Sequence, residues 1–256
     1  MVKMVILGSS YAVADESHEN THMVLIGSKR SVMVDCVCRP IFRLKKAGID
    51  FNGLTGLILT HFHPDHVSGV PLLLMNMWIL KRTQPLIIYG LHHTLDRVEH
   101  LMRFYGWEDW PNFFPVVFHR LPAEEMVPVL ENSEYRIHAS PVKHLIPTIG
   151  LRIEAIRSQK VLVYSCDTEP CPQVVRLAQG ADWLIHEAHG EMAGHSSAYQ
   201  AGNIAREAGV AYLYLIHYPT GDFDFHSLIK EAQKSFNENV GLAEDYMEIV
   251  LDETSL

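Results

Sequence analysis

The sequence predicts an α/β protein in which two β-sheets pack face to face and helices cover their outer faces, an αββα sandwich. The first part of the chain is rich in short apolar strands, whereas strands and helices alternate after Asp167. This order of elements is typical of packed sheets flanked by helices. With 256 residues and 48% apolar content, the chain is long enough to bury such a core. We expect a single domain over residues 1–256.

Composition indicates a protein of the cytoplasm. The net charge of −9 argues against a broad basic surface for nucleic acid. The four cysteines fit neither a C-x-x-C motif nor a disulfide scaffold, so a reducing compartment is expected. The N-terminus lacks the pattern of a signal peptide, and no apolar run reaches the roughly 18–20 residues of a membrane span. No membrane partner is therefore expected.

The first half of the chain is expected to build one sheet with its covering helices. Strands are predicted at residues 2–7, 22–26, 32–36, 56–59 and 86–89, and helices at residues 40–47, 67–81 and 94–104. The turn residues Gly-Ser-Lys-Arg at 27–30 predict a hairpin, and Gly48 ends the first helix. The helix at 67–81 is apolar nearly all round, which predicts that it is buried. The polar loop 11–21 is expected to be solvated.

Residues 104–114, within the aromatic stretch 104–118, suit neither a regular helix nor a strand, because a proline, a glycine and six aromatic residues crowd together there. Two interpretations stay open. The aromatic side chains form a lid or a dimer surface, since exposed aromatic residues are enriched at interfaces. Alternatively, they belong to a loop whose rings fold down on the core.

In the second half, consecutive strands lead up to Asp167, and helices and strands alternate after it. Strands are predicted at residues 116–120, 134–138, 148–156, 161–165, 183–186, 211–216 and 247–251, and helices at residues 196–208 and 226–236 and from residue 170 onwards.

One heptapeptide, Thr-His-Phe-His-Pro-Asp-His at residues 60–66, predicts a metal site. It follows a short apolar strand. Side chains two residues apart on a strand point the same way, so His61 and His63 can bind one ion together. Asp65 and His66 lie where the chain turns, and they can reach a second ion. Imidazole and carboxylate are ligands that suit zinc and related metals.

Three further ligands are predicted at the ends of other strands. His144 closes a strand-like segment at residues 137–143, Asp167 follows the apolar strand at 161–165, and His217 follows the strand that ends at Ile216. Asp167 is suited to bridge two ions, because a carboxylate offers two oxygen atoms.

The motif His-Phe-His-Pro-Asp-His, followed in order by His144, Asp167 and His217, resembles the metallo-β-lactamase superfamily over essentially the whole chain. The resemblance implies the αββα sandwich of that superfamily and a dinuclear metal site. It also implies that Asp35 orients a metal-bound histidine from behind.

Residues outside the ligand set resemble the ribonuclease Z group of this superfamily. The blocks are His-Glu-Ala-His at 186–189, Gly-His-Ser-Ser at 194–197 and Tyr-Ser-Cys-Asp-Thr at 164–168, which resemble the group's His-Glu-Ala-Thr, its downstream His-Ser-Thr and its Tyr-Ser-Gly-Asp-Thr. These blocks place the chain nearer to phosphodiesterases than to lactamases or thioesterases. They imply catalytic roles for Glu187 and His195.

The chain departs from the ribonuclease Z pattern in three ways. Only 22 residues separate His144 from Asp167, where that group inserts a long arm that grasps precursor tRNA. Tyr-Pro-Thr-Gly-Asp follows His217 in place of the usual serine and arginine, and Cys166 replaces a glycine. The first two departures weaken the tRNA assignment, because affinity for many nucleotides needs a cationic surface. They leave phosphodiester hydrolysis intact.

The resemblance implies a mechanism with two divalent ions, zinc or manganese, roughly 3.5–4 Å apart. His61, His63 and His144 hold one ion, Asp65, His66 and His217 hold the other, and Asp167 bridges them. A hydroxide between the ions attacks the phosphorus, and Asp65 can accept a proton as well as bind metal. His195, oriented by Glu187, protonates the leaving oxygen. Because His195 precedes a predicted helix N-terminus, its imidazole is expected to lose a proton easily.

The expected function is therefore a ribonuclease Z-like phosphodiesterase, an endonuclease acting on RNA or a hydrolase of small phosphodiesters, working as a homodimer. No organic cofactor is expected. The alternative within this fold is a small-molecule ester hydrolase of the arylsulfatase or lactonase type. A different class, the diiron flavoproteins of the superfamily, adds a further carboxylate ligand and a flavodoxin-like domain, for which this chain has no room.

Overall fold

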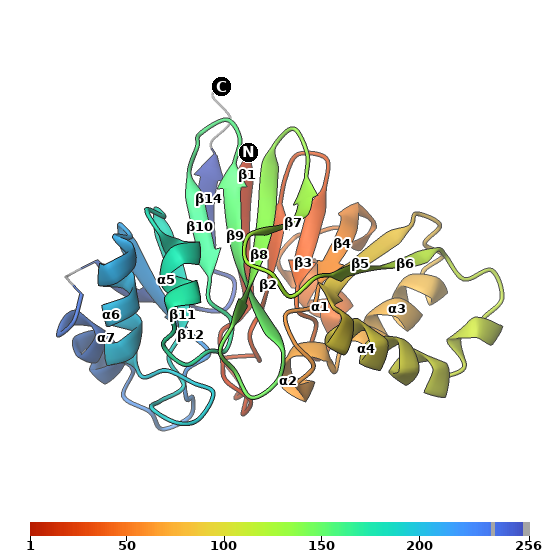
Figure 1. Cartoon of the computed structure of the whole chain (residues 1–256). Coiled ribbons are helices and arrows are strands. Elements are labelled where there is room, and N and C mark those ends of the chain that lie inside the picture. The colour runs from red at the N-terminus through yellow and green to blue at the C-terminus, as the bar shows by residue number, and fades with distance from the viewer. Residues whose placement is uncertain (237–238, 253–256) are drawn as a thin grey trace.

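The computed structural model describes residues 1–236 and 239–252, and it confirms two seven-stranded sheets with helices on their outer faces. In Figure 1 the sheets meet in the middle of the molecule, with α5, α6 and α7 on one side and α1, α3 and α4 on the other. The predicted αββα sandwich is therefore the observed architecture. Within the described ranges, no helix combines the length and the apolar character needed to cross a bilayer.

The first sheet contains the N-terminal strands and the last strand of the chain. Its spatial order is β14 (Glu248–Asp252), β1 (Val2–Gly8), β2 (His22–Ile26), β3 (Ser31–Val34), β4 (Leu54–Ile58), β5 (Leu86–Leu91) and β6 (Val116–Leu121). The pairs from β14 to β3 are antiparallel, and the pairs from β3 to β6 are parallel.

The second sheet has the same mixture of directions. Its spatial order is β13 (Val240–Leu242), β12 (Tyr212–Ile216), β11 (Trp183–Glu187), β10 (Val161–Tyr164), β9 (Thr148–Ala155), β8 (Tyr135–Val142) and β7 (Val127–Glu131). The pairs from β7 to β10 are antiparallel, and the pairs from β10 to β13 are parallel.

Alternation along the strands divides the core into three layers. In β1, Met4 and Ile6 point between the sheets, whereas Val5 and Leu7 point to the helices outside the first sheet. In β10, Leu162 points between the sheets, and Val163 points to the helices outside the second. Successive side chains of a strand point to opposite faces of its sheet. A strand that contributes to the central layer and to an outer layer must therefore be apolar on both faces, as β1 and β10 are,.

In the part of the chain that the structure describes, six helices cover the two outer faces. They are α1 (Pro40–Lys46), α3 (Val70–Ile79) and α4 (His92–Phe104) over the first sheet, and α5 (Pro172–Ala178), α6 (Ala198–Ala208) and α7 (Phe225–Gln233) over the second.

The predicted helix at 67–81 is wrong in two respects. The chain forms a short helix α2 (Pro64–Val67) and then α3, with a break at Ser68 and Gly69. At the break the Gly69 N–H donates to the Cys36 carbonyl over 2.9 Å, and a Cβ on Gly69 would collide with the Val37 backbone. The helix is not buried all round either, because Leu72 lies 38% exposed to solvent.

Two strands and several helix boundaries differ from the predictions. Strand β7 escaped prediction because Pro128 interrupts its pattern, and an edge strand tolerates proline. Strand β13 is only three residues long. Helix α5 starts at Pro172 and not at Pro170. Helix α6 starts at Ala198, because Ser197 and Gln200 form a capping box that fixes its first turn,.

The aromatic stretch 104–118 mostly packs on the outer layer of the first sheet. Trp107, Trp110 and Phe113 contact that apolar cluster, and the rings of Trp110 and Trp78 stack with centroids 4.9 Å apart. These contacts confirm the interpretation in which the rings fold down on the core. Phe104 and Tyr105 are the exceptions, since they are 89% and 59% exposed.

The strand ends that carry the predicted ligands meet at one edge of the sandwich. In Figure 1, α2 lies at the lower edge between the two halves, while the labelled N-terminus and the tip of β14 lie at the upper edge. Strand β4 in the first sheet and strands β8, β10 and β12 in the second lead into the predicted ligand segments. Two sheets that face each other therefore bring residues separated by more than 150 positions into one site.

Candidate metal centre

All seven predicted metal ligands lie in one compact cluster. Side-chain atoms of the first group lie within 4.8 Å of one another, and so do those of the second. The first group is His61, His63, His144 and Asp167, and the second is Asp65, His66, Asp167 and His217. Asp167 belongs to both groups, as the sequence predicted for a bridging residue.

Asp167 is the centre of this cluster. Its Oδ2 lies 3.4 Å from His217 Nε2, 3.5 Å from His66 Nε2 and 3.8 Å from His61 Nε2. The carboxyl is buried, which alone would raise its pKa, but the imidazoles of His217 and His66 hold the pKa well below its usual range. Asp167 is therefore an anion enclosed by imidazole nitrogens.

The cluster fits divalent cations. His66 Nε2 and Asp167 Oδ1 are buried and have no hydrogen-bond partner in the described chain, an arrangement that costs about 1–3 kcal/mol for each group unless a ligand satisfies it. His63 Nδ1 lies 3.1 Å from both His61 Nε2 and His144 Nε2, so several lone pairs converge on one point. Imidazole and carboxylate donors in this arrangement suit a divalent metal.

The protonation of the rings agrees with this fit. Burial lowers the pKa of His217 to about 4 and that of His61 well below its usual value, so both rings are neutral and keep a free lone pair. Burial would also lower the pKa of His66, but the carboxylates of Asp167 and Asp35 raise it well above the usual value. The position between these two carboxylates therefore favours a positive charge.

Groups behind the cluster fix the direction of its rings. The His66 Nδ1–H donates to Asp35 Oδ2 over 2.7 Å, and the His144 Nδ1–H donates to the Gly194 carbonyl over 2.6 Å. These bonds leave Nε2 of each ring for the centre. Asp35 is itself held by the N–H and the hydroxyl of Thr60, both at 2.8 Å. The contact to His66 is the one that the family resemblance implied for Asp35.

Sequence reasoning missed several of these supports. Thr60 links Asp35 to His61, since its hydroxyl also lies 3.1 Å from His61 Nδ1. Thr21 lies 3.3 Å from His217 Nδ1 and is fully buried, although its loop was expected to be solvated. That loop also buries Glu19 beside the Arg43 guanidinium. The polar sequence of the loop 11–21 did not indicate that Thr21 and Glu19 are buried, because their partners His217 and Arg43 come from distant segments of the chain.

Glu187 and His195 form a second, adjoining arrangement. Glu187 is fully buried, and its Oε1 accepts from His195 Nδ1 over 3.0 Å and from the Thr168 and Ser196 N–H groups over 3.0 and 3.1 Å. The His195 ring lies between two of the predicted ligands, with its centroid 5.0 Å from that of His144 and 5.8 Å from that of His217. The structure thus places His195 beside the metal cluster with Nε2 uncommitted.

The expectation that His195 loses its proton easily is wrong. Helix α6 begins three residues after it, and its first turn is capped by Ser197. Burial would lower the pKa of His195, but the hydrogen bond to Glu187 and the charge of that carboxylate raise it above its usual value. Burial in turn raises the pKa of Glu187 to about 7. Glu187 and His195 therefore share a proton that His195 can carry at a pH near 7.

Cys166 is buried beside Asp167 with a left-handed backbone, at φ 55°. Its Sγ lies 3.6 Å from His61 Nδ1. Burial, followed by the charge of Asp167, raises the pKa of this thiol well above its usual value, so it stays neutral. The side chain fills the space behind His61, in a backbone conformation that a glycine would adopt without strain.

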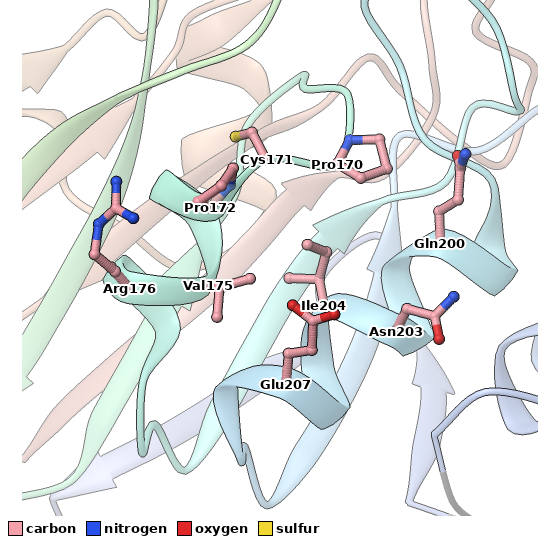
Figure 2. A pocket seen from close by; sticks show the side chains of 9 residues that line it. All are labelled: Pro170, Cys171, Pro172, Val175, Arg176, Gln200, Asn203, Ile204 and Glu207. Carbon is pink, nitrogen blue, oxygen red and sulfur yellow. The ribbon is translucent and has the colours of Figure 1, made fainter.

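A separate pocket of about 470 Å³ lies between α5 and α6, as Figure 2 shows. Val175 and Ile204 form part of its apolar wall, and Arg176 at its edge pairs with Glu125 over 2.7 Å. None of the predicted ligand or catalytic residues lines it. Its chemistry is therefore separate from that of the metal cluster.

Comparison with known families gives one match over most of the chain. A family model described as Anti-Pycsar protein Apyc1 matches residues 2–240. Ribonuclease Z from Methanothermobacter thermautotrophicus is 27% identical, over 97% of this chain and 96% of its own length. Ribonuclease Z from Mycobacterium sp. strain KMS is 29% identical, over 96% and 94%. The predicted resemblance to ribonuclease Z is confirmed.

Solved structures agree on the fold. The metallo-β-lactamase fold protein YhfI from Bacillus subtilis superposes with a TM-score of 0.80 at 22% identity, over 97% of this chain and 98% of that one. The short form of human tRNase Z superposes with a TM-score of 0.78 at 22% identity, over 98% and 100%. The fold is therefore the metallo-β-lactamase fold that the motifs predicted.

The contact between Asp35 and His66 gives a first prediction. Asp35→Asn keeps the size of the side chain and tolerates the left-handed backbone at φ 58°,, but it removes the charge behind the ring. We expect zinc affinity, measured by competition with a chelator, to fall about 10–100-fold. The exposed Asp109→Asn on the far helical layer is the matched control. Equal affinities in the two variants would show that Asp35 does not tune the metal site.

Proposed function

The chain belongs to the family described as Anti-Pycsar protein Apyc1, and from this premise we propose that it is a metal-dependent phosphodiesterase. Its substrate is RNA, cleaved endonucleolytically, or a small phosphodiester. The observation that carries the proposal is the pair of His and Asp groups that share the buried carboxylate of Asp167. The relatives named ribonuclease Z, and the fold shared with a structure titled as a diphosphatase of the PhnP family, support phosphorus-centred chemistry.

We assign the site two divalent ions, zinc in the first place and manganese as the alternative. His61, His63 and His144 would hold one ion, Asp65, His66 and His217 the other, and Asp167 both. Bound ions of this kind lower the pKa of water and neutralise charge on a phosphoryl group. The convergence of neutral imidazoles on an anionic carboxylate supports this assignment.

The protein's own residues supply proton transfer. Asp65 is the most exposed carboxylate of the cluster, with 15% of its side chain accessible, so it can accept a proton from a water molecule at the mouth. His195 keeps a proton through its bond to Glu187 and offers Nε2 to the leaving oxygen. The four hydrogen bonds that Glu187 accepts hold that pair in place. We therefore assign Asp65, Glu187 and His195 to catalysis.

A small or short substrate suits the chain better than the body of a tRNA. The segment between His144 and Asp167 forms only β9, β10 and their connections, so it contains no separate arm. A net charge of −9 gives little affinity for many phosphates at once. Binding energy from remote parts of a large substrate is therefore small.

We further propose a single metallo-β-lactamase-like domain over residues 1–256, working in the cytoplasm as a homodimer. All four cysteines are free thiols, which suits a reducing compartment,. Exposed apolar side chains on α1 and α3, among them Phe42 and Ile79, support contact with a second copy,.

A hydrolysis panel tests the reaction class. We expect the zinc-loaded protein to hydrolyse a phosphodiester such as thymidine 5′-(p-nitrophenyl phosphate) faster than a phosphomonoester, a sulfate ester, a thioester or a lactone. Chelation should abolish the activity, and zinc or manganese should restore it. Preference for the sulfate ester or the lactone would replace this proposal with the arylsulfatase or lactonase alternative.

A matched pair of substrates tests His195. Thymidylyl-(3′,5′)-thymidine and thymidine 5′-(p-nitrophenyl phosphate) share the retained nucleotide but differ in the leaving group. His195→Ala should lower kcat about 10²–10⁴-fold on the first, whose alkoxide needs a proton. The loss on the second should be much smaller, because p-nitrophenolate departs without help. His226→Ala, an exposed residue of α7, is the control. Equal losses on both substrates would mean that His195 is not the proton donor.

A further inference from the structure

His189 is an imidazole beside the metal cluster for which the mechanism has no use. It follows β11, and its backbone N–H donates to Glu187 Oε2 over 3.0 Å. The carboxylate that orients His195 through Oε1 thus also fixes the position of His189. The rings of His189 and His195 meet edge to face, with centroids 4.3 Å apart.

The imidazole of His189 lies close to those of His195 and His217. Side-chain nitrogens of His189, His195 and His217 lie within 4.8 Å of one another. His217 is assigned to a metal ion, and His195 has one nitrogen bound to Glu187. His189 has no such commitment, because its buried Nδ1 lacks a hydrogen-bond partner in the described chain. A buried nitrogen without a partner is costly, which favours a ligand that satisfies it.

His189 is also a neighbour of His195, the proposed proton donor, and it is not among the proposed metal ligands. The His195 ring contacts three other imidazoles, those of His144, His189 and His217. The first and third are proposed metal ligands, and Glu187 is buried beneath the ring. Among the three imidazoles that contact His195, His189 is therefore the one that is not assigned to a metal ion and whose Nδ1 has no partner in the described chain.

The aromatic ring of Tyr11 packs beside the imidazole of His189. The centroids of the two rings lie 5.2 Å apart. The backbone of Tyr11 is fixed, since its N–H donates to the Tyr218 carbonyl over 3.2 Å and its carbonyl accepts from Asn20 Nδ2 over 2.7 Å. The loop 11–21 therefore presents an aromatic ring at a defined place near the site.

We propose that His189 and Tyr11 form a subsite for the alcohol portion of the substrate, the part that departs with the leaving oxygen. His189 makes a hydrogen bond to a hydroxyl or ester oxygen of that alcohol, and the Tyr11 ring packs against it. The subsite suits a nucleoside leaving group, which has both polar oxygens and a flat base. This inference rests on the proposed phosphodiesterase function.

The test compares His189→Ala, His189→Gln and Tyr11→Leu with the wild-type zinc enzyme. Thymidylyl-(3′,5′)-thymidine has a nucleoside leaving group, and thymidine 5′-(p-nitrophenyl phosphate) has an aryl one. For the first, His189→Ala should raise KM about three- to tenfold, the loss of one hydrogen bond, with kcat changed less than twofold. For the second, neither constant should move more than twofold. His189→Gln retains an N–H donor and should recover most of the affinity. Tyr11→Leu removes the aromatic ring that packs against the alcohol portion, so it should raise KM for thymidylyl-(3′,5′)-thymidine.

Measuring bound zinc distinguishes a failure of the His189 subsite from a failure of the proposed phosphodiesterase function. Each variant should bind as much zinc as His226→Ala, the control on an exposed helix. Equal losses on both substrates, or loss of zinc from His189→Ala, would give His189 a structural role and overturn the subsite. An unchanged KM for thymidylyl-thymidine would overturn it as well. If the wild-type enzyme cleaves neither diester, the proposed function itself is wrong, and the subsite falls with it.

Discussion

A buried carboxylate surrounded by imidazole nitrogens is the interaction on which the site depends. Asp167 is inaccessible to water, and four histidines place a nitrogen within 4.0 Å of its Oδ2. Neutral rings alone would leave the charge and several lone pairs unsatisfied in a medium of low dielectric constant. Divalent cations held by the carboxylate and the rings would remove both costs. The cluster is therefore best understood as a site whose folding and metal binding are coupled.

The arrangement of the ligands requires strained backbone conformations at the ends of three strands. Asp35 after β3, Cys166 after β10 and His217 after β12 all adopt left-handed conformations, with φ between 53° and 58°. Each such residue costs roughly 1–2 kcal/mol. The turn at each position takes the chain out of its sheet and leaves the side chain at the edge where the two sheets meet. Strain of this kind is typical of functional sites.

Much of the site could be predicted because its residues carry local signals. His61, His63, Asp65 and His66 lie in one heptapeptide, and Asp167 and His217 each follow an apolar strand. Asp35 and Glu187 came from the family resemblance. Thr21, Thr60 and the Gly194 carbonyl could not be predicted, because their roles depend on contacts between distant loops. The protonation of His195 was predicted wrongly for the same reason. A helix terminus is visible in sequence, whereas the nearer carboxylate that outweighs it is positioned only by the fold.

We propose that Asp167 serves two cations at once. An anomalous difference map, measured at the zinc edge on crystals of the zinc-loaded protein, tests it most directly. We expect two peaks that flank the Asp167 carboxylate, each at about 2.0–2.1 Å from the imidazole nitrogens of its own group. A single peak, or a peak among His189, His195 and His217 with none at Asp167, would contradict it.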